Sequence, residues 1–284
     1  MAFFTNLGKS EIPQRERSEA FVRAMNEKAR EIGMSESHFS TPSGQGITSH
    51  TTVRELISLI REAASRPTVR EIWGKKTHTF SVGGENEREI ALVSTVQQAA
   101  LEEEYEILGG KTGMWTCDGY DQHNLIMVAK SKESGRIFAG AILGADSADG
   151  RFSAMHELFR VADGEAWEVL RAVSAIAVEL DCDFRVVSEP LYEKNADKLH
   201  IPASVAKVLA IVTALDFIDD SDACVELEAK DLQGGSGAKH FEGDRLTVRE
   251  ILHSMLLPSS NTCAYALASL VGGIILEKAN GNDR

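Results

Sequence analysis

Three β-rich runs near the middle of the chain constrain its fold more than any other feature. They lie within residues 106–145 and read EILGGKTGMWT, HNLIMVAKS and RIFAGAILGA, the last two separated only by KESG. Runs rich in β-branched and aromatic residues, joined by short polar turns, indicate neighbouring antiparallel strands. The sequence therefore predicts an antiparallel meander at the centre of the protein.

Amphipathic helical patterns flank these strands on both sides. Apolar residues recur at helical spacing in 17–32, 51–65, 152–162, 203–218, 246–257 and 262–272. A short helix followed by a strand is predicted within 166–187, and VVSEPLYEK at 186–194 is predicted to pair back as a hairpin, whereas residues 77–110 show only weak periodicity. The order of helices, strands and helices predicts a sheet between two helical blocks.

Composition and charge exclude several classes of function. The 284 residues carry a formal net charge of −13, which argues against nucleic acid or an anionic membrane surface as a partner. No run approaches the roughly 18 to 20 apolar residues of a membrane span, and the first residues lack the pattern of a signal peptide. The four cysteines are far apart and no histidine spacing matches a metal site, so we expect no metal and no other cofactor.

The helical stretch IPASVAKVLAIVTAL, residues 201–215, carries a hydroxyl and an amine on one face. Ser204 and Lys207 are three residues apart, so their side chains are neighbours on a helix. A lysine activates a serine only when burial or a nearby cation lowers its pKa, and this apolar segment supplies burial. Taken alone, the same pattern is typical of a serine that caps its helix beside a lysine that reaches solvent.

Two further short patterns have weak meaning in isolation. In LLPSSNTCAYA, Ser259 and Asn261 follow Pro258 in a turn between two predicted helices, where a helix cap is the ordinary explanation. In LGGKTGMWT, Lys111 and Thr112 offer a cation and a hydroxyl suited to a carboxylate. The glycine at 113 leaves room for a ligand backbone along the strand.

The combination of S-x-x-K, S-x-N and K-T-G is far more specific than any one of these patterns. It resembles the signature of the penicillin-recognising serine acyl-transferases. The segments EPLYEKNADKLHIPASVAK and AFVRAMNEKAREIGMSESHFSTPSG are similar to serine-type D-Ala-D-Ala carboxypeptidases, which are low-molecular-mass penicillin-binding proteins. The resemblance implies an α/β (α+β) fold of the β-lactamase/transpeptidase type, with a five-stranded antiparallel sheet flanked by helices and an all-helical subdomain.

The order of the motifs departs from the family. K-T-G comes first here, although the family places it last. Residues 17–163 match the family's second half and residues 165–276 its first half, so the chain resembles a circular permutant with one catalytic domain over 1–284. Permutation is physically reasonable because termini that lie close together can be joined.

The resemblance implies a role for each catalytic residue. Ser204 would be the nucleophile, Lys207 its general base, and Ser259 a proton relay to the leaving amine. The backbone N–H groups of Ser204 and Met114 would form the oxyanion hole.

The remaining motif residues are implied to bind substrate. Asn261 would bind the substrate amide, while Lys111, Thr112 and Gly113 would receive the terminal carboxylate. Lys111 would also help to keep Lys207 neutral. The implied partners are the D-Ala-D-Ala stem peptide of peptidoglycan and β-lactam antibiotics as covalent inhibitors.

Three alternatives stay open at this stage. A class A β-lactamase needs an E-x-x-L-N element, which residues 1–110 do not contain. A D-peptidase or esterase with another acyl group would use the same motifs, and a catalytically silent penicillin- or peptidoglycan-binding protein would keep the fold. The substrate implies an extracytoplasmic location in the cell envelope, although neither a signal peptide nor a membrane anchor is visible in the sequence.

Overall fold

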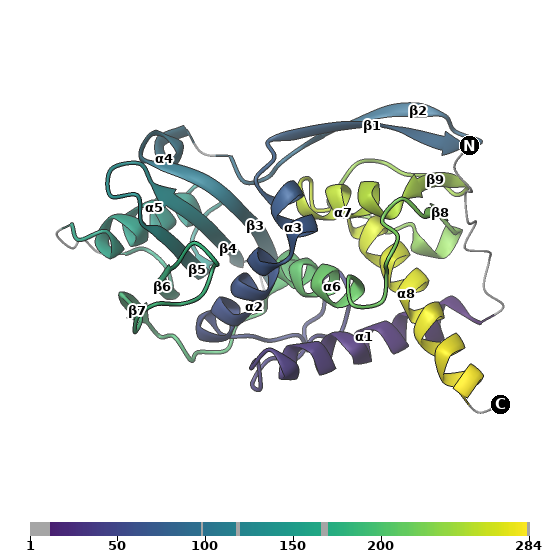
Figure 1. Cartoon of the computed structure of the whole chain (residues 1–284), viewed down its shortest axis with the longest axis horizontal. Coiled ribbons are helices and arrows are strands. Elements are labelled where there is room, and N and C mark those ends of the chain that lie inside the picture. The colour runs from purple at the N-terminus through teal and green to yellow at the C-terminus, as the bar shows by residue number, and fades with distance from the viewer. Residues whose placement is uncertain (1–11, 98, 118–119, 166–169, 283–284) are drawn as a thin grey trace.

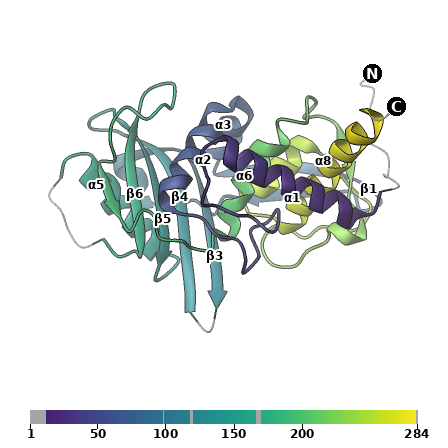
Figure 2. The ribbon, with the colours of Figure 1, turned by 90° about the horizontal axis from the view of Figure 1, so that it is seen from below.

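A five-stranded antiparallel sheet forms one end of the molecule in the computed structural model, which describes residues 12–97, 99–117, 120–165 and 170–282. Its strand order is β3-β4-β5-β6-β7. The strands are β3 (Tyr105–Cys117), β4 (Tyr120–Ser131), β5 (Ile137–Ala145), β6 (Ser174–Leu180) and β7 (Tyr192–Lys194). The predicted meander and the added hairpin are therefore confirmed, and Figure 2 shows β3 and β4 extending beyond the other strands.

Helices cover both faces of this sheet (Figure 1). The helix α5 (Gly150–Ala162) packs on one face and α2 (Val53–Ser65) on the other. Side chains alternate between the two layers: Leu125 and Met127 join the α5 side, whereas Ile126 and Val128 join the α2 side. This two-residue alternation is what a strand buried on both faces requires.

The remaining helices gather at the other end of the molecule. They are α1 (Gln14–Glu31), α3 (Pro67–Trp73), α6 (Ala206–Ala214), α7 (Val248–Leu256) and α8 (Asn261–Asn282). The short helix α4 (Ala99–Glu104) lies beside β3 instead. The chain also forms the 3₁₀ turns η1 (Ala203–Val205) and η2 (Ala229–Asp231). Thr247 and Thr52 cap α7 and α2 by accepting from backbone N–H groups, as their sequence positions favour. α6 ends four residues earlier than the helix expected over 203–218.

The prediction of an all-helical subdomain is wrong. A second sheet with strand order β2-β1-β9-β8 accompanies these helices, formed by β1 (Thr77–Gly84), β2 (Arg88–Val93), β8 (Cys224–Glu226) and β9 (Asp244–Thr247). Only alternate residues of β1 and β2 are buried, namely Phe80 and Val82 with Ile90 and Leu92. The apolar signal in 77–93 is weak because the other side chains of this long hairpin face outward.

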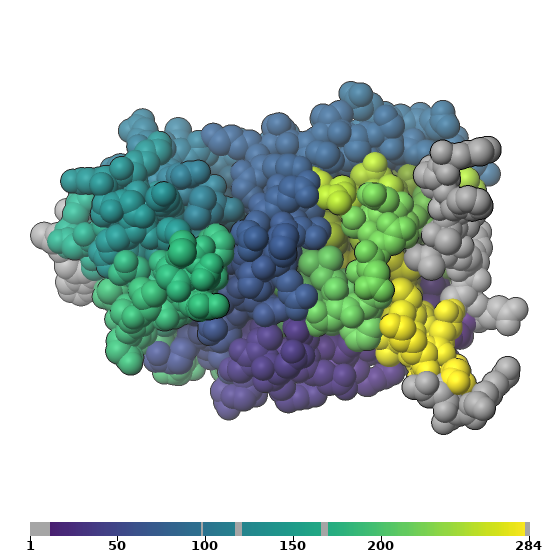
Figure 3. Space-filling model, in the orientation of Figure 1, coloured from purple at the N-terminus to yellow at the C-terminus, as the bar shows by residue number. Residues whose placement is uncertain are grey.

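Residues 17–163 and residues 165–276 contribute side chains to the same hydrophobic cluster. α1 packs along α8 (Figure 2), and the first and last parts of the chain interlock over the surface in Figure 3. The predicted short helix before β6 lies largely in residues 166–169, outside the described residues. Helix α8 over Asn261–Gly281 is long and apolar enough to cross a membrane, but 56% of its apolar window is buried in the protein. Helices in the core of a protein can be equally long and apolar, so the length and composition of α8 do not indicate where the protein is located.

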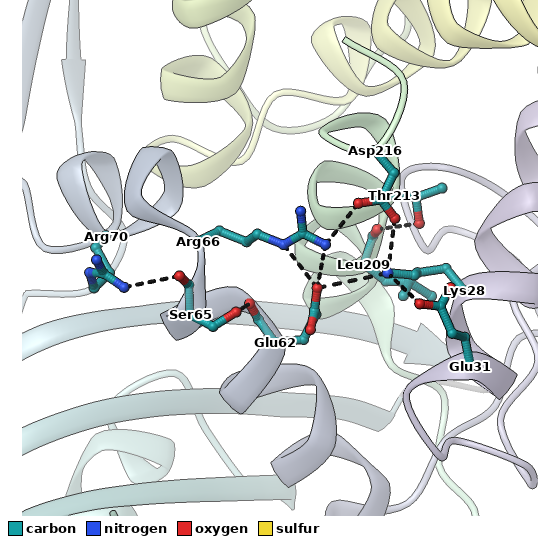
Figure 4. A network of polar contacts seen from close by, with 9 residues as sticks. All are labelled: Lys28, Glu31, Glu62, Ser65, Arg66, Arg70, Leu209, Thr213 and Asp216. Carbon is teal, nitrogen blue, oxygen red and sulfur yellow. Dashed lines mark hydrogen bonds and ion pairs between the residues drawn. The ribbon is translucent and has the colours of Figure 1, made fainter. Parts of the chain in front are cut away.

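A partly buried ion-pair network ties α1 and α2 to the end of α6 (Figure 4). Lys28 Nζ lies 2.9 Å from Asp216 and 3.8 Å from Glu62, and Arg66 donates to both of those carboxylates at 2.7 and 2.6 Å. Lys28 is only 7% exposed and needs these partners, because an unpaired buried charge is costly. The network joins the segment that precedes the K-T-G strand to the end of the helix that carries Lys207.

Candidate active site

The serine and lysine of S-x-x-K meet at the start of α6. Ser204 lies in η1 and Lys207 in the first turn of α6, and Lys207 Nζ is 2.8 Å from Ser204 Oγ. Ser204 is half-buried, whereas Lys207 is fully buried. The predicted neighbours therefore form a hydrogen-bonded pair whose hydroxyl retains access to solvent.

Lys207 is surrounded by hydrogen-bond acceptors rather than by carboxylates. Its Nζ donates to Asn261 Oδ1 at 2.8 Å and to the Ser43 carbonyl at 3.3 Å, and lies 3.4 Å from Ser259 Oγ. Burial lowers the pKa of Lys207 to about 7. A large fraction of this amine is therefore neutral near pH 7 and able to accept a proton.

The S-x-N turn places Ser259 and Asn261 against Lys207. α7 ends at Leu256 and α8 begins at Asn261, as the sequence predicts. Ser259 occupies the left-handed region with φ +70°, which is strained for a residue with a side chain. The Ser260 N–H donates to the Ser254 carbonyl at 2.8 Å and holds this turn against α7. Strain of this kind occurs where surrounding contacts fix a functional geometry.

The K-T-G strand runs along the same site. Lys111 is fully buried, and burial together with the charges of Lys207 and Arg151 lowers its pKa well below the ordinary value. Thr112 Oγ1 lies 2.7 Å from Thr95 Oγ1. A Cβ at Gly113 would lie 2.9 Å from the Pro202 carbonyl, so this glycine lets β3 approach the turn that holds Ser204.

The three motifs thus converge from distant parts of the sequence. Two family models match complementary regions of the chain. Residues 16–147, which contain K-T-G, match the family described as D-alanyl-D-alanine carboxypeptidase. Residues 184–278, which contain S-x-x-K and S-x-N, match the family described as beta-lactamase enzyme family.

Both matches show that the chain is similar to the penicillin-recognising serine hydrolases. A curated relative, D-alanyl-D-alanine carboxypeptidase DacF of Bacillus subtilis (strain 168), is 28% identical over 107 residues. The match covers 36% of this chain and 26% of the relative. No solved structure matches the chain.

One cation at this site was not foreseen from the sequence. Arg151, near the start of α5, donates through Nη1 to the Gly113 carbonyl at 3.2 Å. Its Nε is buried without a hydrogen-bond partner, and burial lowers the pKa of the guanidinium. Arg151 and Lys111 therefore place two basic side chains close together beside Gly113, within a protein of net charge −13. An arginine in a helix gives no sequence signal of this kind, because only the fold brings α5 to the K-T-G strand.

A second unforeseen residue positions the serine's turn. Asn124, on β4, donates to the carbonyls of Ile201 and Pro202 at 2.9 and 3.2 Å and accepts from the Gly144 N–H at 3.1 Å. The turn itself is strained, since Ala203 has φ +49°. Asn124 therefore fixes the chain immediately before Ser204.

The loop over residues 40–49 supplies the Ser43 carbonyl to Lys207. Gly44 lies against the turn that precedes Ser204 with φ +78°, and a Cβ there would lie 1.8 Å from the Ala203 carbonyl. In the sequence, the glycine at position 44 in the run FSTPSGQG was the feature that could have predicted this close approach. Among the described residues, no group of His, Cys, Asp or Glu is arranged to hold a metal ion.

Proposed function

We propose that this chain is a serine D-Ala-D-Ala carboxypeptidase that acts through an acyl-enzyme at Ser204. The observation that carries the proposal is the 2.8 Å contact between Lys207 Nζ and Ser204 Oγ, together with the pKa of about 7 that burial gives Lys207. A neutral lysine at this distance is a general base for the serine hydroxyl. Near neutral pH the pair is ready to react.

The proposed acylation moves one proton across the site. Ser204 Oγ attacks the carbonyl between the two D-alanines while Lys207 takes its proton. Ser259, 3.4 Å from Lys207, passes a proton to the amine of the leaving D-alanine. Backbone N–H groups of Ser204 and Met114 would hold the oxyanion, a contribution worth about 10²- to 10³-fold in rate per donor. Water then hydrolyses the ester and restores both side chains.

The two basic side chains of Lys111 and Arg151 favour a substrate that ends in a carboxylate. Lys111, Thr112 and Arg151 line the β3 edge beside Gly113, and the groups that shift the pKa of Lys111 include two cations and no carboxylate. A bound carboxylate would raise the pKa of Lys111 toward its ordinary value and so favour its charged form. The C-terminal D-alanine of a peptidoglycan stem peptide carries such a carboxylate. Since peptidoglycan lies in the cell envelope, we propose that the enzyme acts there.

β-Lactamase activity is a second candidate, because residues 184–278 match a family with that description. Rapid hydrolysis of penicillin needs a base for deacylation. Among the described residues, the hydrogen bonds of Lys207 go to Ser43, Ser204, Ser259 and Asn261 and to no carboxylate. We therefore expect the penicilloyl adduct at Ser204 to persist, which makes penicillin an inhibitor.

We also infer that the chain is circularly permuted. K-T-G precedes the other two motifs, yet β3–β5 from the first part and β6–β7 from the second complete one sheet. The hydrogen bonds from Asn124 to Ile201 and Pro202 also cross between the two parts. This arrangement supports a single catalytic domain that uses both parts.

Labelling with a fluorescent penicillin, followed by mass spectrometry, tests the proposal. The wild type and Ser188→Ala should form a stable adduct, and Ser204→Ala should form none. Ser188 is an exposed serine whose hydroxyl donates to the carbonyl of its neighbour Glu189. The same proteins are then assayed for D-alanine release from an acyl-D-alanyl-D-alanine peptide. Fast turnover of penicillin would identify a β-lactamase. Absence of an adduct and of D-alanine release would identify a catalytically silent protein.

A further inference from the structure

A glycine-rich loop wraps the S-x-N turn. The loop reads QGGSG over residues 233–237 and bonds to the turn through both backbone and side chains. The Asn261 N–H donates to the Ser236 carbonyl at 3.1 Å, and Ser236 Oγ donates to the Ser259 carbonyl at 2.7 Å. Gln233 bonds to Thr262 through its N–H and its carbonyl at 3.0 and 3.1 Å. The loop is therefore fixed to the residues that face Lys207.

One contact of this loop determines which way the Asn261 amide points. Asn261 Nδ2 donates to the Gly234 carbonyl at 2.8 Å, while Oδ1 accepts from Lys207 at the same distance. If the amide were flipped, its N–H groups would face the N–H donors of Lys207. Its oxygen would face the Gly234 carbonyl oxygen, so that one acceptor would lie opposite another. The Gly234 carbonyl therefore selects the orientation in which Asn261 offers Lys207 an acceptor.

This orientation also directs the lone pair of Lys207. A neutral amine has two N–H donors and one lone pair. Asn261 Oδ1 and the Ser43 carbonyl accept the two N–H groups, at 2.8 and 3.3 Å. The lone pair is then left for the Ser204 hydroxyl. A loop that fixes the amide thereby fixes the direction of the base.

Close approach of the loop depends on Gly235. Its φ is +104°, and a Cβ there would lie 2.6 Å from Asn261 Nδ2 and 3.4 Å from Gln45 Nε2. Gly234 is different, because a Cβ there would meet nothing within 4 Å and its backbone is outside the left-handed region. The two neighbouring glycines thus form a natural pair of test and control positions.

We propose that the Gly234–Ser236 segment is a positioning element that sets the orientation of the Asn261 amide and, through it, the direction in which Lys207 accepts the proton of Ser204. The proposal rests on the proposed function, since it assigns the loop to the same acylation step. None of the loop residues contacts the reacting carbonyl in this scheme. Gly235 acts by leaving space for the amide that Gly234 binds.

The test compares Gly235→Ala with Gly234→Ala in the full chain. The measured quantity is the rate constant for acylation by a fluorescent penicillin between pH 5 and 9. Gly235→Ala should lower the plateau rate by about 10- to 100-fold, the effect of a displacement near 1 Å at a reacting group. The midpoint should also move to lower pH, because Lys207 loses an acceptor that favours its ammonium form. Gly234→Ala should retain the rate within about twofold and the wild-type midpoint.

Three results would overturn the positioning role. They are wild-type behaviour of Gly235→Ala, equal damage by Gly234→Ala, and a slower Gly235→Ala with an unmoved midpoint, which indicates general distortion alone. If Gly235→Ala does not fold, hydrogen exchange of the side-chain amide is measured by NMR in the wild type. Asn261 should exchange far more slowly than the exposed Asn280, and equal rates would refute the inference. A wild type that forms no adduct at any pH overturns the proposed function instead.

Discussion

The amine of Lys207 lies 2.8 Å from the hydroxyl of Ser204, and burial holds the pKa of this amine at about 7. The sequence places the two residues one turn apart, but their reactivity depends on the elements that close around them. Asn261 and Ser259 of the S-x-N turn, and Ser43 of the loop over residues 40–49, supply acceptors from two other segments. The following predictions separate the contribution of each element.

Acylation should depend on pH through Lys207. The base must be neutral, so the rate constant for penicillin should rise with pH and reach half of its plateau near pH 7. Stopped-flow or quenched labelling of the wild type between pH 5 and 9 measures this profile. A rate that does not change with pH, or a midpoint above pH 9, would contradict the assignment of Lys207 as the base.

Replacing Lys207 with methionine should abolish acylation and stabilise the fold. The folded pKa of about 7 lies below the ordinary value of 10.5, so the unfolded chain binds an additional proton between these values. The contribution of Lys207 to stability is therefore least below pH 7 and recovers as the pH rises toward 10.5. Lys207→Met should gain a few kcal/mol at pH 7, since each pH unit is worth about 1.4 kcal/mol.

Urea denaturation at pH 7 and at pH 9.5 measures this difference. The advantage of Lys207→Met should shrink at the higher pH. Lys130→Met, at an exposed position of β4, serves as the control and should change the free energy of unfolding by less than about 0.5 kcal/mol. Equal stability of Lys207→Met and wild type at pH 7 would show that Lys207 is not a destabilised neutral amine.

Gly113→Ala should push β3 away from the nucleophile's turn. The added Cβ would lie 2.9 Å from the Pro202 carbonyl and 3.3 Å from Ala203 Cβ. We expect acylation to fall by about 10- to 100-fold and the free energy of unfolding to fall by about 1 to 3 kcal/mol. Gly83→Ala, whose Cβ would make only ordinary contacts from 3.7 Å outward, is the matched control in β1. Similar acylation rates in the two variants would refute the close approach.

Asn124→Ala should slow acylation because it releases the chain before Ser204. The substitution removes bonds to Ile201, Pro202 and Gly144, and the buried groups left without partners should cost about 1 to 3 kcal/mol of stability. Asn26→Ala is the control, since its amide also makes three backbone bonds, to Val22 and Phe39. It should lose similar stability but little acylation rate, and parallel loss of activity in both variants would argue against a specific role for Asn124.

The helices and strands that the sequence predicts correctly are those with a strong local pattern of apolar residues. The strands over 105–145 and the helices α1, α2 and α5 were confirmed, because each has a sustained apolar period of two or near 3.6. The hairpin of β1 and β2 was missed, and so the subdomain predicted to be all-helical contains a sheet. Its pairing with β9, more than 150 residues away, is a long-range contact that local periodicity cannot reveal.

The sequence by itself determined the chemical groups of the site, because Ser204, Lys207, Ser259, Asn261 and the K-T-G residues are recognisable from type and spacing. Only the tertiary structure decided which partners orient them. Arg151, Asn124, the Ser43 carbonyl and the Gly234 carbonyl reach the site from α5, β4 and two loops. Two of these partners are backbone carbonyls, which every residue type possesses. Their role depends on their position in the fold, so no residue type in the sequence predicts it.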